Sequence, residues 1–224
     1  MSMKEVKIMV VTKNKVISSL FWKLMERGGT QGVQFIVQVV LARLLLPEEY
    51  GIISLTTIFI AIANVFIQQG FGTALVQRKN IKEEEISTVF FLNLLVAFIL
   101  YFIIFLISPI VAAFYEQPIL TNVLRVLALS LFLGAINSVQ NAIVARRMQF
   151  KRFFYSSLSG IIISGIIGII FAYKGFGVWA LVVNQILNLL ISTIVLWFTV
   201  KWRPKLVFRI KEIKELFSFG WRVL

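Results

Sequence analysis

Polar and cationic side chains recur along one side of the apolar segment at residues 18–46. Lys23, Arg27, Gln31, Gln34 and Gln38 follow one another at steps of four, four, three and four residues, which places them on one face of an α-helix. The other positions are almost all apolar. Such a stripe must turn away from lipid. It can line a polar pathway, or it can join helices through amide hydrogen bonds. Because a lone cation is costly to bury in lipid, Arg27 favours the pathway.

The composition is that of an integral membrane protein. The 224 residues are 59% hydrophobic, with a mean hydropathy of +0.90, and several apolar runs exceed the roughly 18 residues that suggest a membrane-spanning helix. The net charge of +13 comes mostly from short segments between these runs, so topology explains it better than a nucleic-acid partner does. With no Cys and no His, the chain lacks thiol chemistry and imidazole metal ligands. We expect no metal and no cofactor.

Six membrane-spanning helices are predicted, which makes the fold class all-α. A basic leader at 1–17 precedes the six-helix membrane lobe at 18–200, and a basic segment at 201–224 follows it. The leader has no small-residue cleavage site, so it is not a cleavable signal peptide. The expected helices cover residues 18–46, 50–76, 86–114, 119–144, 153–173 and 178–200.

The distribution of Lys and Arg predicts the orientation. These residues crowd the leader, the second and fourth loops and the C-terminal segment, whereas the opposite side of the membrane has Arg43, near the end of the first helix, and Lys174. Cytoplasmic loops are enriched in Lys and Arg, so both ends of the lobe are expected in the cytoplasm.

A short similarity between the two ends suggests an internal repeat. Aligning Trp22 with Trp221 also pairs Ser19 with Ser218 and Lys23 with Arg222. We therefore expect a seventh helix to begin at Phe217, as the start of a second six-helix unit that this sequence does not complete. Parallel repeats of this kind are a transporter architecture.

Several segments, in this order and spacing, resemble the bacterial polysaccharide transporter family (oligosaccharide flippase, Wzx-like) of the multidrug/oligosaccharidyl-lipid/polysaccharide exporter superfamily. They are LARLLLPEEYG, IQQGFGTALVQRKN, ARRMQFKRF, GFGVWALV and LFSFGWRVL. The resemblance implies two six-helix lobes around a V-shaped cavity, of which this chain covers one, the N-terminal half. It implies export of undecaprenyl-diphosphate-linked oligosaccharide, a surface polysaccharide precursor, to the outer leaflet of the bacterial inner membrane by alternating access. Its expected partners are membrane lipids, the lipid-linked saccharide and the second lobe.

That cargo gives roles to the polar residues. We expect Arg27, Arg125 and Lys23 to bind the diphosphate, since Arg binds phosphate bidentately. We expect amides to line a polar lumen and bind the sugar: Gln31, Gln34, Gln38, Asn137, Asn184 and Asn188. Simpler roles stay open. Lys23 and Arg125 can extend to the membrane surface, Arg27 can pair with Glu26, and some of the amides can join helices.

Other functions remain as alternatives. A multidrug exporter of the same superfamily would have a more aromatic cavity and an acidic residue inside the membrane. A membrane-embedded enzyme would need paired carboxylates, His or a metal site, and the acidic run Glu83–Glu85 is better explained as a charged helix start. A scaffold without transport activity fits a chain that is naturally this short. No GxxxxGK[ST] phosphate-binding motif is present, so ATP hydrolysis by that route is excluded.

Overall fold

The computed structural model describes residues 13–70 and 83–205. These residues form helices and no strands, which confirms the all-α prediction. The helices are α1 (Lys13–Leu44), α2 (Pro47–Gly70), α4 (Glu83–Phe114), α5 (Ile119–Ala128), α6 (Ser130–Arg146), α7 (Phe150–Tyr173) and α8 (Val178–Thr199). The segments at 1–12, 71–82 and 206–224 lie outside the described residues, and with them the expected seventh helix at Phe217.

Most of these helices can cross a membrane. Within the described ranges, five stretches are long and apolar enough to do so: 47–67, 83–114, 119–146, 150–173 and 178–199. The chain is therefore a multi-pass membrane protein. The stretch at 119–146, predicted as one helix, is divided at Leu129, where a tight turn separates α5 from α6. Helix α1 is not among the five because its charged and glutamine side chains make it less apolar than the others, although its 32 residues would extend about 48 Å.

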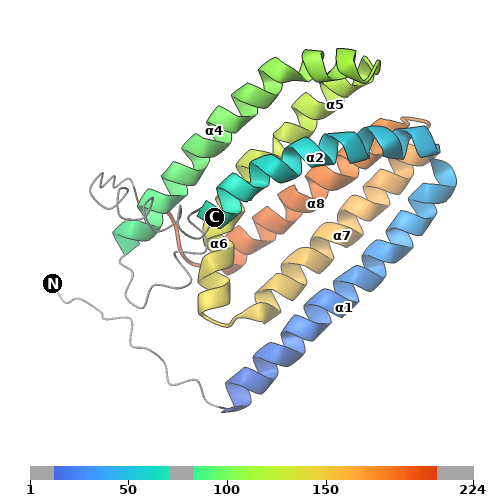
Figure 1. Ribbon diagram of the computed structural model, residues 1–224. Coiled ribbons are helices and arrows are strands. Elements are labelled where there is room, and N and C mark those ends of the chain that lie inside the picture. The colour runs from blue at the N-terminus through green and yellow to red at the C-terminus, as the bar shows by residue number, and fades with distance from the viewer. Residues whose placement is uncertain (1–12, 71–82, 206–224) are drawn as a thin grey trace.

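The helices form one bundle with α1 at its edge (Figure 1). Helix α7 lies between α1 and α8 and contacts both along most of its length. Helix α4 packs on α5 and α6, and α2 contacts α4, α5, α6 and α8. Helices α1 and α2 meet at the corner around Pro47 and diverge from it (Figure 1). Because α1 and α2 share no extensive contact, one flank of α1 is left uncovered by the described helices.

Small residues bring α7 close to both neighbours. A Cβ atom at Gly160 would lie 2.7 Å from Asn188 Oδ1 and 2.8 Å from the Asn188 carbonyl oxygen of α8. A Cβ atom at Gly165 would lie 2.6 Å from a methyl carbon of Val37 on α1. Lipid tails are as apolar as the helices, so close packing rather than hydrophobic burial drives this association.

Two amide-to-hydroxyl hydrogen bonds join α6 to α4 and to α8 inside the bundle. Asn93 of α4 donates to Ser138 Oγ of α6 over 2.7 Å, and Ser138 in turn donates to the Ala135 carbonyl. Asn137 of α6 likewise donates to Thr193 Oγ1 of α8 over 2.7 Å. Both asparagines are buried, so these bonds satisfy amide N–H groups that lipid could not, while the Oδ1 atoms of both side chains accept no hydrogen bond from the described residues.

The segment after α8 binds to the start of α4. This end of the bundle also carries Arg146, Arg147, Lys151 and Arg152, and we call it the basic end. Lys205 forms an ion pair of 2.7 Å with Glu83, and its backbone N–H donates to Ser87 Oγ. The hydrogen bond to Glu83 raises the pKa of Lys205 above its usual value. Glu83, Glu84 and Glu85 form the first turn of α4, where the helix dipole favours negative charge.

Candidate functional site

The edge helix α1 uses one face for packing and leaves the adjoining polar flank open. Its packing face against α7 includes Trp22, Gly29, Val33 and Val37, which are half-buried. The polar stripe defined by Lys23, Arg27, Gln31, Gln34 and Gln38 lies about 120° around the helix from this face. Four of the five stripe residues are exposed and Gln34 is half-buried. The stripe therefore does not serve as amide contact between the described helices.

The two cations of the stripe are available to an anion. Lys23 Nζ lies 5.3 Å from the centroid of the Phe150 ring, a cation–π contact that leaves its charge uncompensated. Neither Lys23 nor Arg27 pairs with a carboxylate in the part of the chain that the structure describes, Glu26 included. An anionic group bound here would thus gain charge-assisted hydrogen bonds without displacing an existing ion pair.

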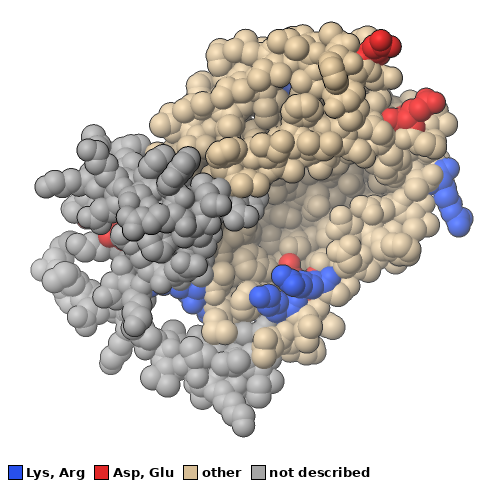
Figure 2. Space-filling model, in the orientation of Figure 1, with Lys and Arg blue, Asp and Glu red and all other residues tan. Residues whose placement is uncertain are grey.

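The stripe borders a hollow in the surface. Figure 2 shows the molecule hollowed between α2 and the N-terminal half of α1, with Lys and Arg side chains gathered over α1 at its rim. Helices α1 and α2 diverge from their corner toward the basic end of the bundle (Figure 1). Along α1, the cations Lys23 and Arg27 lie nearer the basic end, and Gln31, Gln34 and Gln38 follow toward the corner.

Gln185 is an amide on the inner side of α8 that is not among the residues selected from the sequence. It is exposed, and it lies about 180° around the helix from Ile194, which is 45% exposed on the apolar side. Its neighbours Asn184 and Asn188 are half-buried against α7, so the exposure of Gln185 depends on how α7 packs and no local sequence pattern identifies it. Gln185 extends the set of exposed amides from α1 to α8.

The three asparagines assigned to a polar lumen lie instead at helix contacts. Asn137 is 5% exposed and bonded to Thr193. Asn184 and Asn188 are half-buried against Gly168 and Gly160 of α7. The structure therefore does not bring these three residues together with the stripe on α1, and a sugar contact by any of them stays a prediction.

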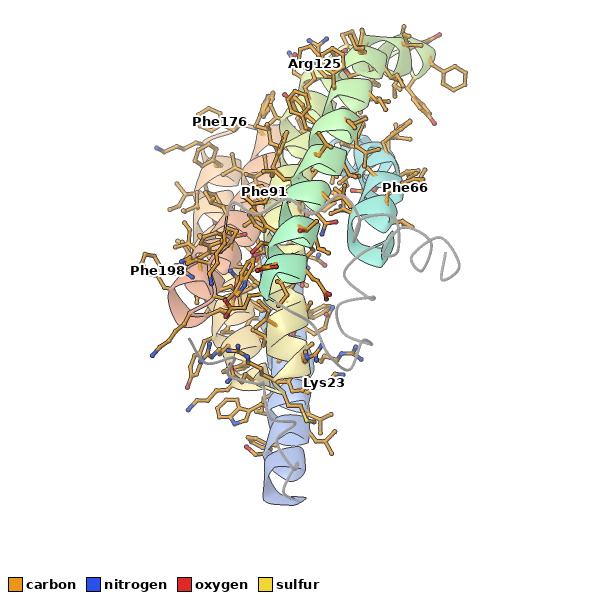
Figure 3. The ribbon with its side chains drawn as sticks, turned by 90° about the vertical axis from the view of Figure 1, so that its left-hand side faces the viewer. Lys23, Phe66, Phe91, Arg125, Phe176 and Phe198 are labelled. Carbon is orange, nitrogen blue, oxygen red and sulfur yellow. The ribbon has the colours of Figure 1, made fainter. Side chains whose placement is uncertain are left out.

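Arg125 of α5 binds to α4, far from Lys23 and Arg27. Its Nε donates to Ser108 Oγ over 2.9 Å and to the Phe105 carbonyl over 3.4 Å, and its guanidinium lies 4.0 Å from the Phe105 ring centroid. Pro109 has no N–H to bond the carbonyl of Phe105, four residues earlier. Ser108 and Arg125 supply donors to that carbonyl. Figure 3 shows Arg125 and Lys23 at opposite ends of the bundle, so a single diphosphate site cannot use both.

Metal-ligating groups are sparse in the described ranges 13–70 and 83–205. They contain no cluster of three or more His, Cys, Asp or Glu residues able to hold a metal ion. The chemistry that this arrangement supports is recognition of a polar, anionic molecule by exposed cations and amides along a helix at membrane depth.

Comparison with known proteins gives one family and a consistent set of relatives. Residues 40–224 match the family described as "Polysaccharide biosynthesis protein". The succinoglycan biosynthesis transport protein ExoT of Rhizobium meliloti (strain 1021) is 26% identical over 212 residues, which cover 94% of this chain and 43% of ExoT. The teichuronic acid biosynthesis protein TuaB of Bacillus subtilis (strain 168) is 29% identical over 167 residues, which cover 70% of this chain and 33% of TuaB.

A third relative extends the range of polysaccharides. The lipopolysaccharide biosynthesis protein WzxC of Escherichia coli (strain K12) is 22% identical over 214 residues, which cover 93% of this chain and 43% of WzxC. The chain thus spans less than half the length of these curated relatives. No solved structure shows a significant match to it.

Proposed function

The chain belongs to the polysaccharide biosynthesis protein family, and we propose that it supplies one lobe of a Wzx-like transporter that moves a lipid-linked oligosaccharide across the bacterial inner membrane. The observation that carries this proposal is the uncovered polar stripe on α1, which borders a hollow in an otherwise apolar bundle. The relatives' names supply the class of cargo, since one of them is a succinoglycan biosynthesis transport protein.

The order of residues along the stripe fits an undecaprenyl-diphosphate-linked saccharide. Such a cargo carries two anionic phosphates next to a chain of hydroxyl-rich sugars. Lys23 and Arg27 lie toward the basic end, which the positive-inside rule assigns to the cytoplasm. They would take the diphosphate near the headgroup layer, and Gln31, Gln34, Gln38 and Gln185 would bind sugar hydroxyls deeper in the hollow.

A second lobe completes the proposed transporter. The exposed flank of α1 and the hollow beside it would become the wall of a cavity between two lobes, and rocking of the lobes would expose that cavity alternately to each side. The relatives are long enough to contain two units of this size, because the chain covers 43% of ExoT and of WzxC.

The proposal predicts that Arg27 is needed for export. Arg27→Gln removes charge-assisted hydrogen bonds to the diphosphate, each contributing about 1.5–3 kcal/mol, so export of the lipid-linked precursor should fall at least about tenfold. Arg27→Lys keeps the charge but not the bidentate geometry and should give an intermediate loss. The assay follows precursor accumulation on the cytoplasmic leaflet in cells that depend on this gene for export.

Arg43→Gln is the matched control for this experiment. Arg43 is an exposed arginine near the other end of the same helix, and its loss should leave export unchanged at equal protein levels. Normal export by the Arg27→Gln variant would overturn the proposed diphosphate site. Resistance to small cationic drugs without any effect on the precursor would favour the multidrug alternative instead.

A further inference from the structure

A second group of cationic and aromatic residues lies on the opposite side of the contact between α1 and α7. Lys151 Nζ lies 5.2 Å from the ring centroid of Trp22 and 5.8 Å from that of Tyr155. The centroids of Trp22 and Tyr155 are 6.1 Å apart. We call these three residues the Lys151 cluster. It joins the two helices at the basic end of the bundle.

The Lys151 cluster lies on an exposed side of α7 that continues as an apolar face. Residues 151, 155, 162 and 166 fall within about 60° of one another around the helix. Ile162 and Ile166 are 41% and 56% exposed, and exposed isoleucines on a membrane-spanning helix face acyl chains. On α1, by contrast, the polar stripe begins at Lys23, about 100° from Trp22. The α1–α7 contact therefore separates the polar flank from the Lys151 cluster.

The chemistry of the Lys151 cluster suits an anionic headgroup. Its three polar groups are an ammonium, an indole N–H and a phenol, all hydrogen-bond donors. Lys151 pairs with no carboxylate among the residues that the structure describes. Trp and Tyr concentrate at the headgroup level of membranes, and basic residues there attract anionic lipids.

We propose that the Lys151 cluster binds the phosphodiester headgroup of an anionic phospholipid, with an acyl chain lying along Ile162 and Ile166. The lipid would fill the seam between α1 and α7 from outside and hold the edge helix in place. The apolar continuation of the same face is what favours a phospholipid over a free phosphate, which has no acyl chain to place there. The inference does not depend on the nature of the transported cargo.

The test measures which lipid touches Trp22. The protein, purified as its own gene encodes it, is placed in nanodiscs that contain phosphatidylglycerol and phosphatidylcholine, with brominated acyl chains on one or the other. Fluorescence quenched by bromine is compared with that of Trp22→Phe to isolate the signal of Trp22. One cation near the membrane surface contributes about 1 kcal/mol toward anionic lipid, so we expect about a fivefold preference for phosphatidylglycerol.

Two variants and a competitor decide the outcome. Lys151→Gln should abolish the preference, while Lys174→Gln, an exposed lysine just after the other end of α7, should retain it. Equal quenching by both lipids in the unaltered protein, or an undiminished preference in Lys151→Gln, would overturn the proposal. Displacement of phosphatidylglycerol by equimolar undecaprenyl diphosphate would also overturn it, because the Lys151 cluster would then belong to the cargo route.

Discussion

Gly165→Ala should weaken the packing of α1 against α7 without altering any charged residue. The added methyl carbon would lie 2.6 Å from Cγ2 and 3.2 Å from Cγ1 of Val37, whereas carbon atoms pack at about 3.5–4.0 Å. Valine in a helix has one strongly preferred rotamer, and both of its methyl groups are in the way. Rotation of the side chain therefore does not relieve the clash, and α1 must move outward by roughly 1 Å.

The expected loss of stability follows from two opposing terms. Forcing an extra methyl group into a close-packed contact costs about 1–3 kcal/mol. Alanine is a better helix former than glycine by up to about 1 kcal/mol, which offsets part of that cost. We expect a net loss of up to about 2 kcal/mol, measured as reversible unfolding of the purified protein in mixed detergent micelles.

Gly32→Ala is the control, because it makes the same chemical change on α1 with no atom within 4 Å of the new methyl group. It should be neutral or slightly stabilising. Adding Val37→Ala to Gly165→Ala should restore part of the lost stability. If Gly165→Ala and Gly32→Ala unfold alike, the close contact between α1 and α7 described above is not present in the membrane protein, and the reasoning fails.

Two further predictions concern polar groups inside the bundle. Arg125→Gln should cost about 1–2 kcal/mol of stability in the natural sequence. The cost should be smaller in a Pro109→Ala background, because the new N–H of residue 109 can bond the Phe105 carbonyl. An equal cost in both backgrounds would contradict the role of Arg125 as a donor to that carbonyl. A double-mutant unfolding cycle with Asn137→Leu and Thr193→Val should give a coupling free energy of about 0.6 kcal/mol, and of no more than about 1.7 kcal/mol. Strict additivity of the two substitutions would show that the hydrogen bond between these side chains contributes nothing.

Much of the architecture follows from periodicity in the sequence. The spacing of Lys23, Arg27 and the three glutamines predicted a polar flank on the first helix, and the structure leaves that flank uncovered. Glycines on a membrane-spanning helix allow neighbouring backbones to approach closely, and Gly160 and Gly165 of α7 lie at such contacts. These patterns are local, so a single helix is enough to reveal them.

Periodicity does not predict which side of a helix packs against its neighbours. Asn184, Gln185 and Asn188 lie within about 100° of one another around α8, and only the position of α7 decides that Gln185 is the exposed amide. Arg125 is a similar case. Its partner, the carbonyl left free by Pro109, lies on another helix, and the sequence does not fix how α5 rotates against α4.

Cysteine accessibility along α1 tests the central claim most directly, because the chain has no natural cysteine. Gln31→Cys places a thiol on the polar stripe, and Ile36→Cys places one on the apolar side of the same helix, where Ile36 is 64% exposed. If the stripe lines an aqueous pathway, a charged, membrane-impermeant maleimide should label Gln31→Cys and not Ile36→Cys, and lipid-linked saccharide should slow the labelling. Labelling of Ile36→Cys alone, or of neither variant, would show that the stripe is not in contact with water and would contradict the proposed transport route.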